Sequence, residues 1–268
     1  MARGTVLLNG ASLAYRDAGN GRAVVFAHGH PFDQSMWDPQ VAALSWKYRV
    51  ITLDLRGYGA SEVPAVEVIT LETMAADIRD LLDHLGVDRA VVAGLSMGGQ
   101  VAMAFVDLFP QRLAGLVLAA TFAEAETPEG AVARRAMADR FASEGSVLPG
   151  GEMLPKLLAP ASVKRDPALA VEVFGMIAHA PPAGAAAALR GRAMRKDYLE
   201  PLRHVAVPAL IVVGAEDRFS SLDQARRMRD AIPMARLEVI ECVGHMPNLE
   251  AADRFNALLH AYLAELAG

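Results

Sequence analysis

The sequence has one cysteine, no long apolar run and no dense cluster of basic residues, and each shortage excludes a class of protein. Because Cys242 is the only cysteine among 268 residues, we expect neither an internal disulfide nor a cysteine-based metal site. No apolar stretch approaches the roughly 18 residues that cross a bilayer, and the apolar part of the first ten residues is too short for a signal peptide. We therefore expect a cytoplasmic protein that does not enter a membrane.

Positive charge is also scarce relative to negative charge. The chain has 26 Lys and Arg residues against 31 Asp and Glu residues, a net charge of −5, and its basic residues occur as short pairs such as Arg134-Arg135. Since binding to phosphates needs a dense basic surface, we expect no nucleic-acid partner. The sequence also has neither a glycine-rich dinucleotide loop nor a clustered set of metal-ligating residues, so we expect no cofactor and no metal.

The most informative motif lies between residues 91 and 105. An apolar run from Val91 predicts a buried strand, and residues 100–105 predict a helix. Between them is Gly94-x-Ser96-x-Gly98, the spacing of a nucleophile elbow. In such a turn the central residue has a strained backbone, and only small neighbours let the strand and helix pack closely. Ser96 would then point away from the sheet at the positive end of the helix, where negative charge is favoured.

Apolar runs and helical periodicity alternate along most of the chain. This pattern predicts a mostly parallel sheet covered by helices on both faces. Besides the strand at Val91, we expect strands at residues 5–8, 12–17, 23–27, 49–53, 113–120, 209–214 and 236–240. Helices are expected at residues 38–46, 71–85, 100–105 and 251–266 and, in the middle of the chain, at 131–141 and 168–177.

The alternation breaks between residues 122 and 196. This segment contains no clear strand and is rich in Ala, Met, Arg and Pro. A long helical insertion between two strands of a sheet is typical of a lid over the carboxyl ends of the strands. We therefore predict a core formed by residues 1–121 and 197–268 and a helical lid formed by residues 122–196.

Two further side chains follow late strands, as a serine nucleophile requires. A serine hydroxyl is a weak nucleophile at neutral pH, so it needs an adjacent base, and the base needs a carboxylate that orients it. Asp217 lies three residues after the strand over 209–214, and His245 lies five residues after the strand over 236–240. Because reactive groups gather at the carboxyl ends of parallel strands, we predict that Ser96, Asp217 and His245 are the catalytic residues.

Alternatives to two of these assignments remain open at the level of the sequence. Asp217 could be a helix-capping residue, and Glu216 or Asp223 could orient the base in its place. His245 could be an ordinary surface histidine, although no other histidine follows a late strand.

The motifs together resemble the α/β-hydrolase superfamily. The resemblance implies an eight-stranded, mostly parallel sheet with a helical lid inserted after the sixth strand, and it implies the order serine, aspartate, histidine along the chain. The motifs that carry it are His28-Gly29, Asp54-x-Arg56-Gly57-x-Gly59-x-Ser61, Gly94-x-Ser96-x-Gly98-Gly99, Gly214-x-x-Asp217 and Gly244-His245.

Within the superfamily, the chain resembles small bacterial esterases, cofactor-free haloperoxidases and 3-oxoadipate enol-lactonases. The first two likenesses depend on residues 28–31 and on Met97 after the nucleophile, and the third depends on residues 36–40 and 59–64. The resemblance implies an oxyanion hole formed by the backbone N–H groups of His30 and Met97. The His30 side chain either lines the acyl pocket or has a packing role. We expect the substrate pocket to be lined by Phe32, Phe122, Phe141, Phe174, Phe219 and Met246.

These features predict a serine hydrolase that cleaves small to medium carboxylic esters through an acyl-enzyme. The alternatives are a lactonase or enol-lactone hydrolase, a hydrolase of C–C bonds, and a non-catalytic ligand receptor. A serine rather than an aspartate at the elbow argues against dehalogenase and epoxide hydrolase chemistry. The expected partner is a small-molecule ester or lactone, and the chain is compatible with a monomer or a homodimer. A substrate that bears a carboxylate would need a cation, for which the candidates are Arg134, Arg135, Lys196 and Arg218.

Overall fold

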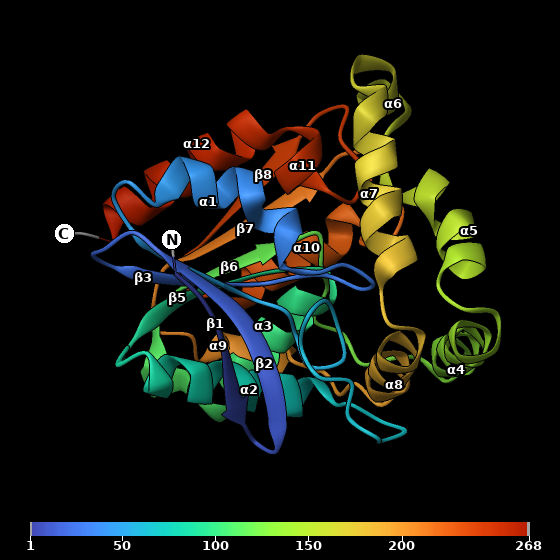
Figure 1. The fold of residues 1–268 in the computed structure, drawn as a ribbon. Helices are drawn as coiled ribbons and strands as arrows, with labels where there is room; N and C mark the ends of the chain where they lie inside the picture. The colour runs from blue at the N-terminus through green and yellow to red at the C-terminus, as the bar shows by residue number, and fades with distance from the viewer. Residues whose placement is uncertain (1, 267–268) are drawn as a thin grey trace.

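A single eight-stranded sheet forms the centre of the molecule (Figure 1). The computed structural model describes residues 2–266. The strand order is β1-β2-β4-β3-β5-β6-β7-β8, in which β2 pairs antiparallel with β1 and β4 and all other neighbours are parallel, so the predicted fold class is confirmed. The strands are β1 (Ala2–Leu8), β2 (Ala11–Ala18), β3 (Ala23–Ala27), β4 (Arg49–Leu53), β5 (Ala90–Leu95), β6 (Leu113–Ala119), β7 (Ala209–Gly214) and β8 (Ala235–Ile240).

Helices cover both faces of this sheet, as expected for buried parallel strands. In Figure 1, α1, α11 and α12 lie above the sheet, and α2, α3 and α9 lie below it. The helices outside residues 122–196 are α1 (Asp38–Leu44), α2 (Leu71–His84), α3 (Met97–Leu108), α9 (Leu199–Arg203), α10 (Leu222–Ala231), α11 (Pro247–Glu250) and α12 (Ala252–Glu265), with short 3₁₀ turns at Gln34–Trp37 and Pro110–Arg112. None of the helices described between residues 2 and 266 has the length and apolarity that crossing a bilayer requires.

Helix α2 shows how the local sequence produces these elements. The Thr70 hydroxyl accepts a hydrogen bond from the N–H of Thr73 and caps the helix N-terminus. Its apolar positions recur at helical spacing and are all buried against the sheet. The helix ends just before Gly86, whose φ of +65° suits glycine.

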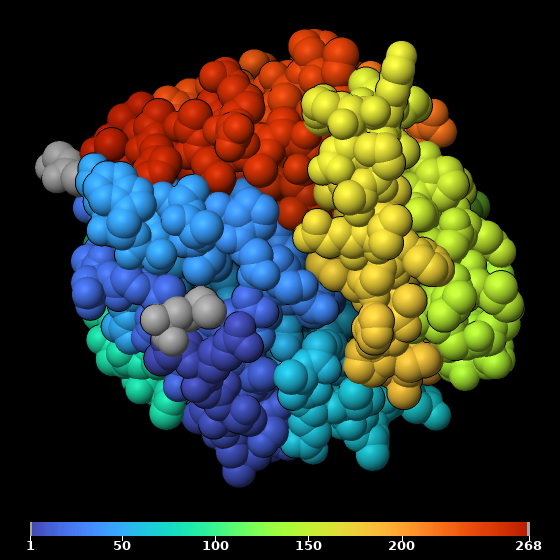
Figure 2. Space-filling model, turned by 45° about the horizontal axis from the view of Figure 1, so that its top comes forward, coloured from blue at the N-terminus to red at the C-terminus, as the bar shows by residue number. Residues whose placement is uncertain are grey.

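Residues 122–196 form a helical insertion between β6 and β7. Figure 2 shows it as a continuous block, green-yellow to orange, beside the N-terminal and C-terminal segments of the core. Helices α4 and α8 lie side by side, and α7 packs against α5 and α6. The five helices are α4 (Pro128–Glu144), α5 (Val147–Leu157), α6 (Pro160–Arg165), α7 (Pro167–His179) and α8 (Pro182–Arg192).

Of the helix boundaries that differ from the sequence-based expectation, two have clear local reasons. Helix α4 begins at Pro128, three residues before the expected start, because the Thr127 side chain caps it and proline suits the first helical position. The expected C-terminal helix over 251–266 is preceded by a separate short turn, α11. The two are divided by Ala251, whose φ of −136° and ψ of 54° are not helical.

Candidate active site

Ser96 occupies a sharp turn between β5 and α3. Its φ of 56° and ψ of −113° lie in a sparsely populated region of backbone space, which costs about 1–3 kcal/mol in a residue with a side chain. The flanking glycines make this turn possible because a Cβ at Gly94 would collide with the carbonyl oxygen of Gly98. A Cβ at Gly98 would in turn collide with the carbonyl oxygen of Ala27 on the neighbouring strand.

His245 and Asp217 are in direct contact at the ends of two neighbouring strands. The Nδ1 atom of His245 lies 2.9 Å from Oδ1 and 3.0 Å from Oδ2 of Asp217. The carboxylate also accepts hydrogen bonds from the N–H of Phe219 at 2.8 Å and from the hydroxyl of Ser220 at 2.5 Å. Burial favours the neutral carboxyl, but the nearby imidazole and these donors outweigh it and lower the pKa of Asp217.

The two other carboxylates that could have oriented the histidine lie elsewhere. Glu216 is exposed to solvent, and Asp223 is exposed and forms an ion pair with Arg226 at 2.9 Å. Asp217 is therefore the carboxylate that the fold brings to His245 within the described residues.

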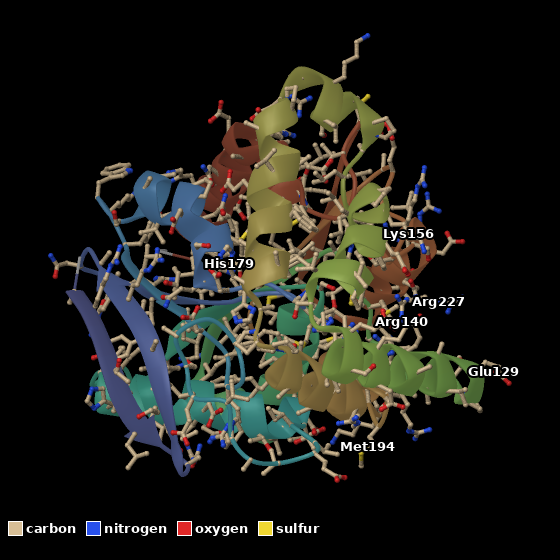
Figure 3. The ribbon with its side chains drawn as sticks, turned by 45° about the vertical axis from the view of Figure 1, so that its right-hand side comes forward. Glu129, Arg140, Lys156, His179, Met194 and Arg227 are labelled. Atoms are coloured by element: carbon tan, nitrogen blue, oxygen red, sulfur yellow. The ribbon has the colours of Figure 1, made fainter. Side chains whose placement is uncertain are left out.

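Ser96 and His245 line one cavity of about 330 Å³, here called the serine cavity. It lies between the carboxyl ends of the core strands and the helical insertion. Figure 3 shows one of its lining residues, Lys156, at the end of α5. Its other lining residues are His30, Gln100, Thr121, Phe122, Gly130, Ala133, Arg134, Met137, Met153, Leu157, Leu189, Arg192 and Phe219.

Two of the six side chains expected in the pocket line the serine cavity. Phe219 packs against the His245 ring with the ring centroids 4.8 Å apart, and Phe122 lies under the Arg195 guanidinium. Their positions follow from their places in the chain, since each comes just after a strand that ends at the cavity.

The other four expected pocket residues lie elsewhere. Phe32 is buried in the core on the α1 side of the sheet and borders a separate, polar groove near β1. Met246 is buried in that same core cluster. Phe141 is packed in the core on the other side, edge-on to the His30 ring, and Phe174 of α7 faces α5.

The loop after β3 is fixed by buried hydrogen bonds. His28 Nε2 accepts from the N–H of Leu55 at 2.9 Å, so Nδ1 carries the proton and donates to the carbonyl of Gly29 at 2.8 Å. Asp54 accepts both from the backbone and from the side-chain amide of Gln34. Burial lowers the pKa of His28, which suits a neutral ring with a structural role.

His30 brings its side chain to the wall of the serine cavity. Its Nδ1 lies 2.7 Å from the hydroxyl of Tyr58, whereas its Nε2 is buried without a hydrogen-bond partner in the described residues. Burial, reinforced by the positive charges of Arg192 and Arg134, holds the pKa of His30 well below its ordinary value. The ring is therefore neutral at physiological pH.

Glu250 holds the turn that carries His245. This carboxylate is only 4% exposed and accepts hydrogen bonds from the N–H groups on both sides of the histidine, Gly244 at 3.0 Å and Met246 at 3.0 Å. It also accepts from the N–H of Ala159 in the helical insertion at 2.8 Å, and the N–H of His245 donates to the carbonyl of Leu157 at 2.8 Å. The insertion and the turn that carries His245 are thus joined by one backbone hydrogen bond and by the Glu250 carboxylate.

Replacing Glu250 with alanine should loosen this turn. Three buried N–H groups would lose their acceptor, so we expect the free energy of unfolding to fall by about 3 kcal/mol in urea titrations. Because a small displacement of a reacting group is costly, we also expect kcat/KM for an ester substrate to fall by about 100-fold. Glu265→Ala, which removes an exposed carboxylate, is the matched control. Lost stability with unchanged kcat/KM would show that Glu250 does not position His245.

Several residues of the site were not predicted from the sequence. Arg192 and Gln100 line the serine cavity, and Glu250 supports it. Of the four cations proposed for a substrate carboxylate, only Arg134 lines the cavity; Lys196 pairs with Asp107, and Arg135 and Arg218 are exposed. No local motif marks Arg192, whereas the position of Gln100 one helical turn after Ser96 is a signal that could have identified it.

Comparisons with known proteins agree with this architecture. A family model for the alpha/beta hydrolase fold matches residues 22–252. The chain is 30% identical to 3-oxoadipate enol-lactonase 1 of Acinetobacter baylyi over 92% of this chain and 90% of that protein. Among solved structures, it is 36% identical to a thermophilic esterase from Thermogutta terrifontis with malate bound, with a TM-score of 0.96 and 99% of each chain covered. It is 30% identical to an enol-lactonase from Burkholderia xenovorans, with a TM-score of 0.90 and 97% of this chain and 100% of that chain covered.

Proposed function

The chain belongs to the α/β-hydrolase family, and on this premise we propose that it is a serine hydrolase that cleaves carboxylic esters through an acyl-enzyme. The observation that carries the proposal is the position of His245. Its Nδ1 contacts the Asp217 carboxylate, and its ring lines the same cavity as Ser96 at the strained turn. A nucleophile, a base and an orienting carboxylate are the groups that acyl transfer by serine needs.

In the proposed mechanism, His245 accepts the Ser96 proton through Nε2 while Oγ attacks the ester carbonyl. Asp217 accepts a hydrogen bond from Nδ1–H, which fixes the tautomer and stabilises the imidazolium that forms. The protonated imidazole then donates its proton to the leaving alcohol. A water molecule that His245 activates next attacks the acyl carbon, which releases the acid and regenerates the serine.

The negative charge of the tetrahedral intermediate would be stabilised by the backbone N–H groups of Met97 and His30. Met97 is the first residue of α3, and His30 follows β3 in the hydrogen-bonded loop, so both come from elements next to Ser96. Neither N–H has a protein acceptor among residues 2–266. One such donor typically contributes about 3 kcal/mol to transition-state stabilisation. The helical insertion, residues 122–196, would then serve as the lid over a core of residues 1–121 and 197–268.

A serine-directed phosphonate probe tests this assignment. We expect the intact protein to gain the mass of one phosphonyl group, and peptide mapping to place it on Ser96. Hydrolysis of p-nitrophenyl butyrate should be lost in proportion to the labelling. If the folded protein binds esters without cleaving them and Ser96 stays unlabelled, the chain is instead a ligand receptor on a hydrolase fold.

A lactone substrate is the second candidate, because two of the similar proteins are named as enol-lactonases. A lactone is a cyclic ester, so the same three residues would open it and the shape of the serine cavity would decide the preference. The two candidates are distinguished by measuring kcat/KM of the same enzyme on lactones and on open-chain esters of equal size. The substrate class with the higher kcat/KM is the preferred one.

A further inference from the structure

The serine cavity has an unbalanced charge. Three of its lining residues are cationic, namely Arg134, Lys156 and Arg192, and no Asp or Glu is among them. The net charge of the chain is −5, so this local excess of positive charge runs against the composition of the whole protein. A cavity with such lining favours an anionic ligand.

Arg192 is the most unusual of these cations. It lies in the last turn of α8, is 7% exposed, and forms no ion pair with a carboxylate among residues 2–266. Its neighbours Arg134 and Arg195 both pair with Glu126, at 2.6 and 3.4 Å. Among residues 2–266, the one hydrogen bond that the Arg192 side chain donates runs from Nε to Oε1 of Gln100 at 3.0 Å, so its terminal NH groups have no protein acceptor there. A buried charge without a partner is strongly unfavourable unless a ligand supplies that partner.

Two other residues that line the cavity each have a buried polar atom without a hydrogen-bond partner among residues 2–266. Oε1 of Gln100 accepts a hydrogen bond from Arg192, and the amide nitrogen of Gln100 is buried with no acceptor in the described part of the chain. His30 Nε2 is also buried without a partner. The Tyr58 hydroxyl has one proton, and His30 Nδ1 at 2.7 Å is a better acceptor for it than the Met97 sulfur at 3.8 Å. The proton of the neutral His30 ring is then on Nε2, which makes this atom a donor as well.

We propose that Arg192, Gln100 and His30 form a subsite for a carboxylate, so that the substrate is an ester or lactone that carries a second, free carboxylate group. This proposal rests on the proposed function, since it names the substrate class of the same cavity. The guanidinium and the two unpaired donors match the two oxygens of a carboxylate, and a bound carboxylate would give the buried Arg192 the counter-charge it lacks.

The spacing of the subsite limits the length of the substrate. The N–H of Gln100 donates to the carbonyl of Ser96 at 3.1 Å, so Gln100 lies one helical turn after Ser96, with the Cβ atoms of the two residues roughly 5–6 Å apart. The free carboxylate should therefore be separated from the scissile ester by a short carbon chain. Monoethyl glutarate fits this description, and ethyl pentanoate is its neutral analogue of nearly the same size.

The test compares the hydrolysis of these two esters in a pH-stat. We expect the wild-type enzyme to have a kcat/KM at least about 10-fold higher for monoethyl glutarate than for ethyl pentanoate. In Arg192→Met, this ratio should fall by about 30-fold, because a charge-assisted hydrogen bond is lost while any general loss of activity cancels in the ratio. Arg190→Met is the matched control, since Arg190 lies on the same helix and pairs with Asp139. It should keep the wild-type ratio.

Other results would overturn the proposal. Equal or better hydrolysis of ethyl pentanoate by the wild type shows that no carboxylate subsite exists, while the proposed ester hydrolysis stands. If neither ester is cleaved and Ser96 is not labelled by the phosphonate, the proposed function fails. In that case, or if Arg192→Met does not fold, the carboxylate subsite is tested by calorimetric titration of the wild type with glutarate and, separately, with neutral glutaramide. If glutarate binds and glutaramide does not, the subsite is supported. If both compounds bind equally well, or if neither binds, the subsite is rejected.

Discussion

Replacing Ser96 with alanine is expected to lower kcat/KM for p-nitrophenyl butyrate by a factor on the order of 10⁴–10⁶. Alanine removes the hydroxyl that we propose as the nucleophile, while it keeps the Cβ and the backbone of the turn. The remaining rate should come from binding in the cavity and from the two backbone N–H groups of the proposed oxyanion hole. Initial rates at saturating and limiting ester concentration, measured against the buffer rate, give the size of the loss.

Ser143→Ala is the matched control for this experiment. Ser143 is exposed on α4 and donates to the carbonyl of Asp139, so its loss should leave the rate within a factor of two. Circular dichroism of both variants checks that the fold is retained. If Ser96→Ala hydrolysed the ester at the wild-type rate, another residue would be the nucleophile and the proposed mechanism would be wrong.

Replacing Asp217 with asparagine is expected to lower kcat by a factor on the order of 10⁴ at pH 7. The change keeps the size of the side chain but places an amide where the carboxylate accepts bonds from Nδ1 of His245, Phe219 N–H and the Ser220 hydroxyl. An amide nitrogen facing Nδ1 favours the tautomer in which Nε2 carries the proton, so the ring can no longer accept the serine proton. The imidazolium that forms in the transition state would also lose its negative partner.

Glu216→Gln is the control for Asp217→Asn. The two carboxylates are adjacent in sequence, but Glu216 is exposed and does not contact His245. We expect Glu216→Gln to have wild-type kcat in the same p-nitrophenyl butyrate assay. A larger loss from Glu216→Gln than from Asp217→Asn would mean that the histidine is oriented by a different carboxylate from the one assigned above.

The fold could be predicted from the sequence because its signals are local. The apolar runs of the parallel strands, the caps of α2 and the glycines around Ser96 each lie within a few residues of the feature that they determine. Asp217 and His245 could be proposed on the same basis, since each follows a strand by a short loop and parallel strands end at one edge of the sheet.

The lining of the cavity could not be predicted in the same way. It depends on which faces of α4, α5 and α8 turn toward Ser96, and α4 and α8 are rich in alanine with no strongly apolar face. The sequence-based prediction places Phe141 and Phe174 in the pocket, although they pack elsewhere, and it does not place Arg192 there. The partner of Arg192 is Gln100, 92 residues away in the sequence, and no local pattern reports such a contact.

The hydrogen bonds between the insertion and the turn that carries His245 limit which segments can be exchanged between homologous enzymes. Because Glu250 joins Ala159 to both neighbours of His245, exchanging residues 122–196 for the equivalent segment of a homologue also exchanges part of the support of His245, the proposed general base. A chimaera designed only to alter substrate preference would then lose turnover as well. A graft should leave residues 157–159 native and exchange only the helices before or after them. Such a graft should change substrate preference without lowering turnover.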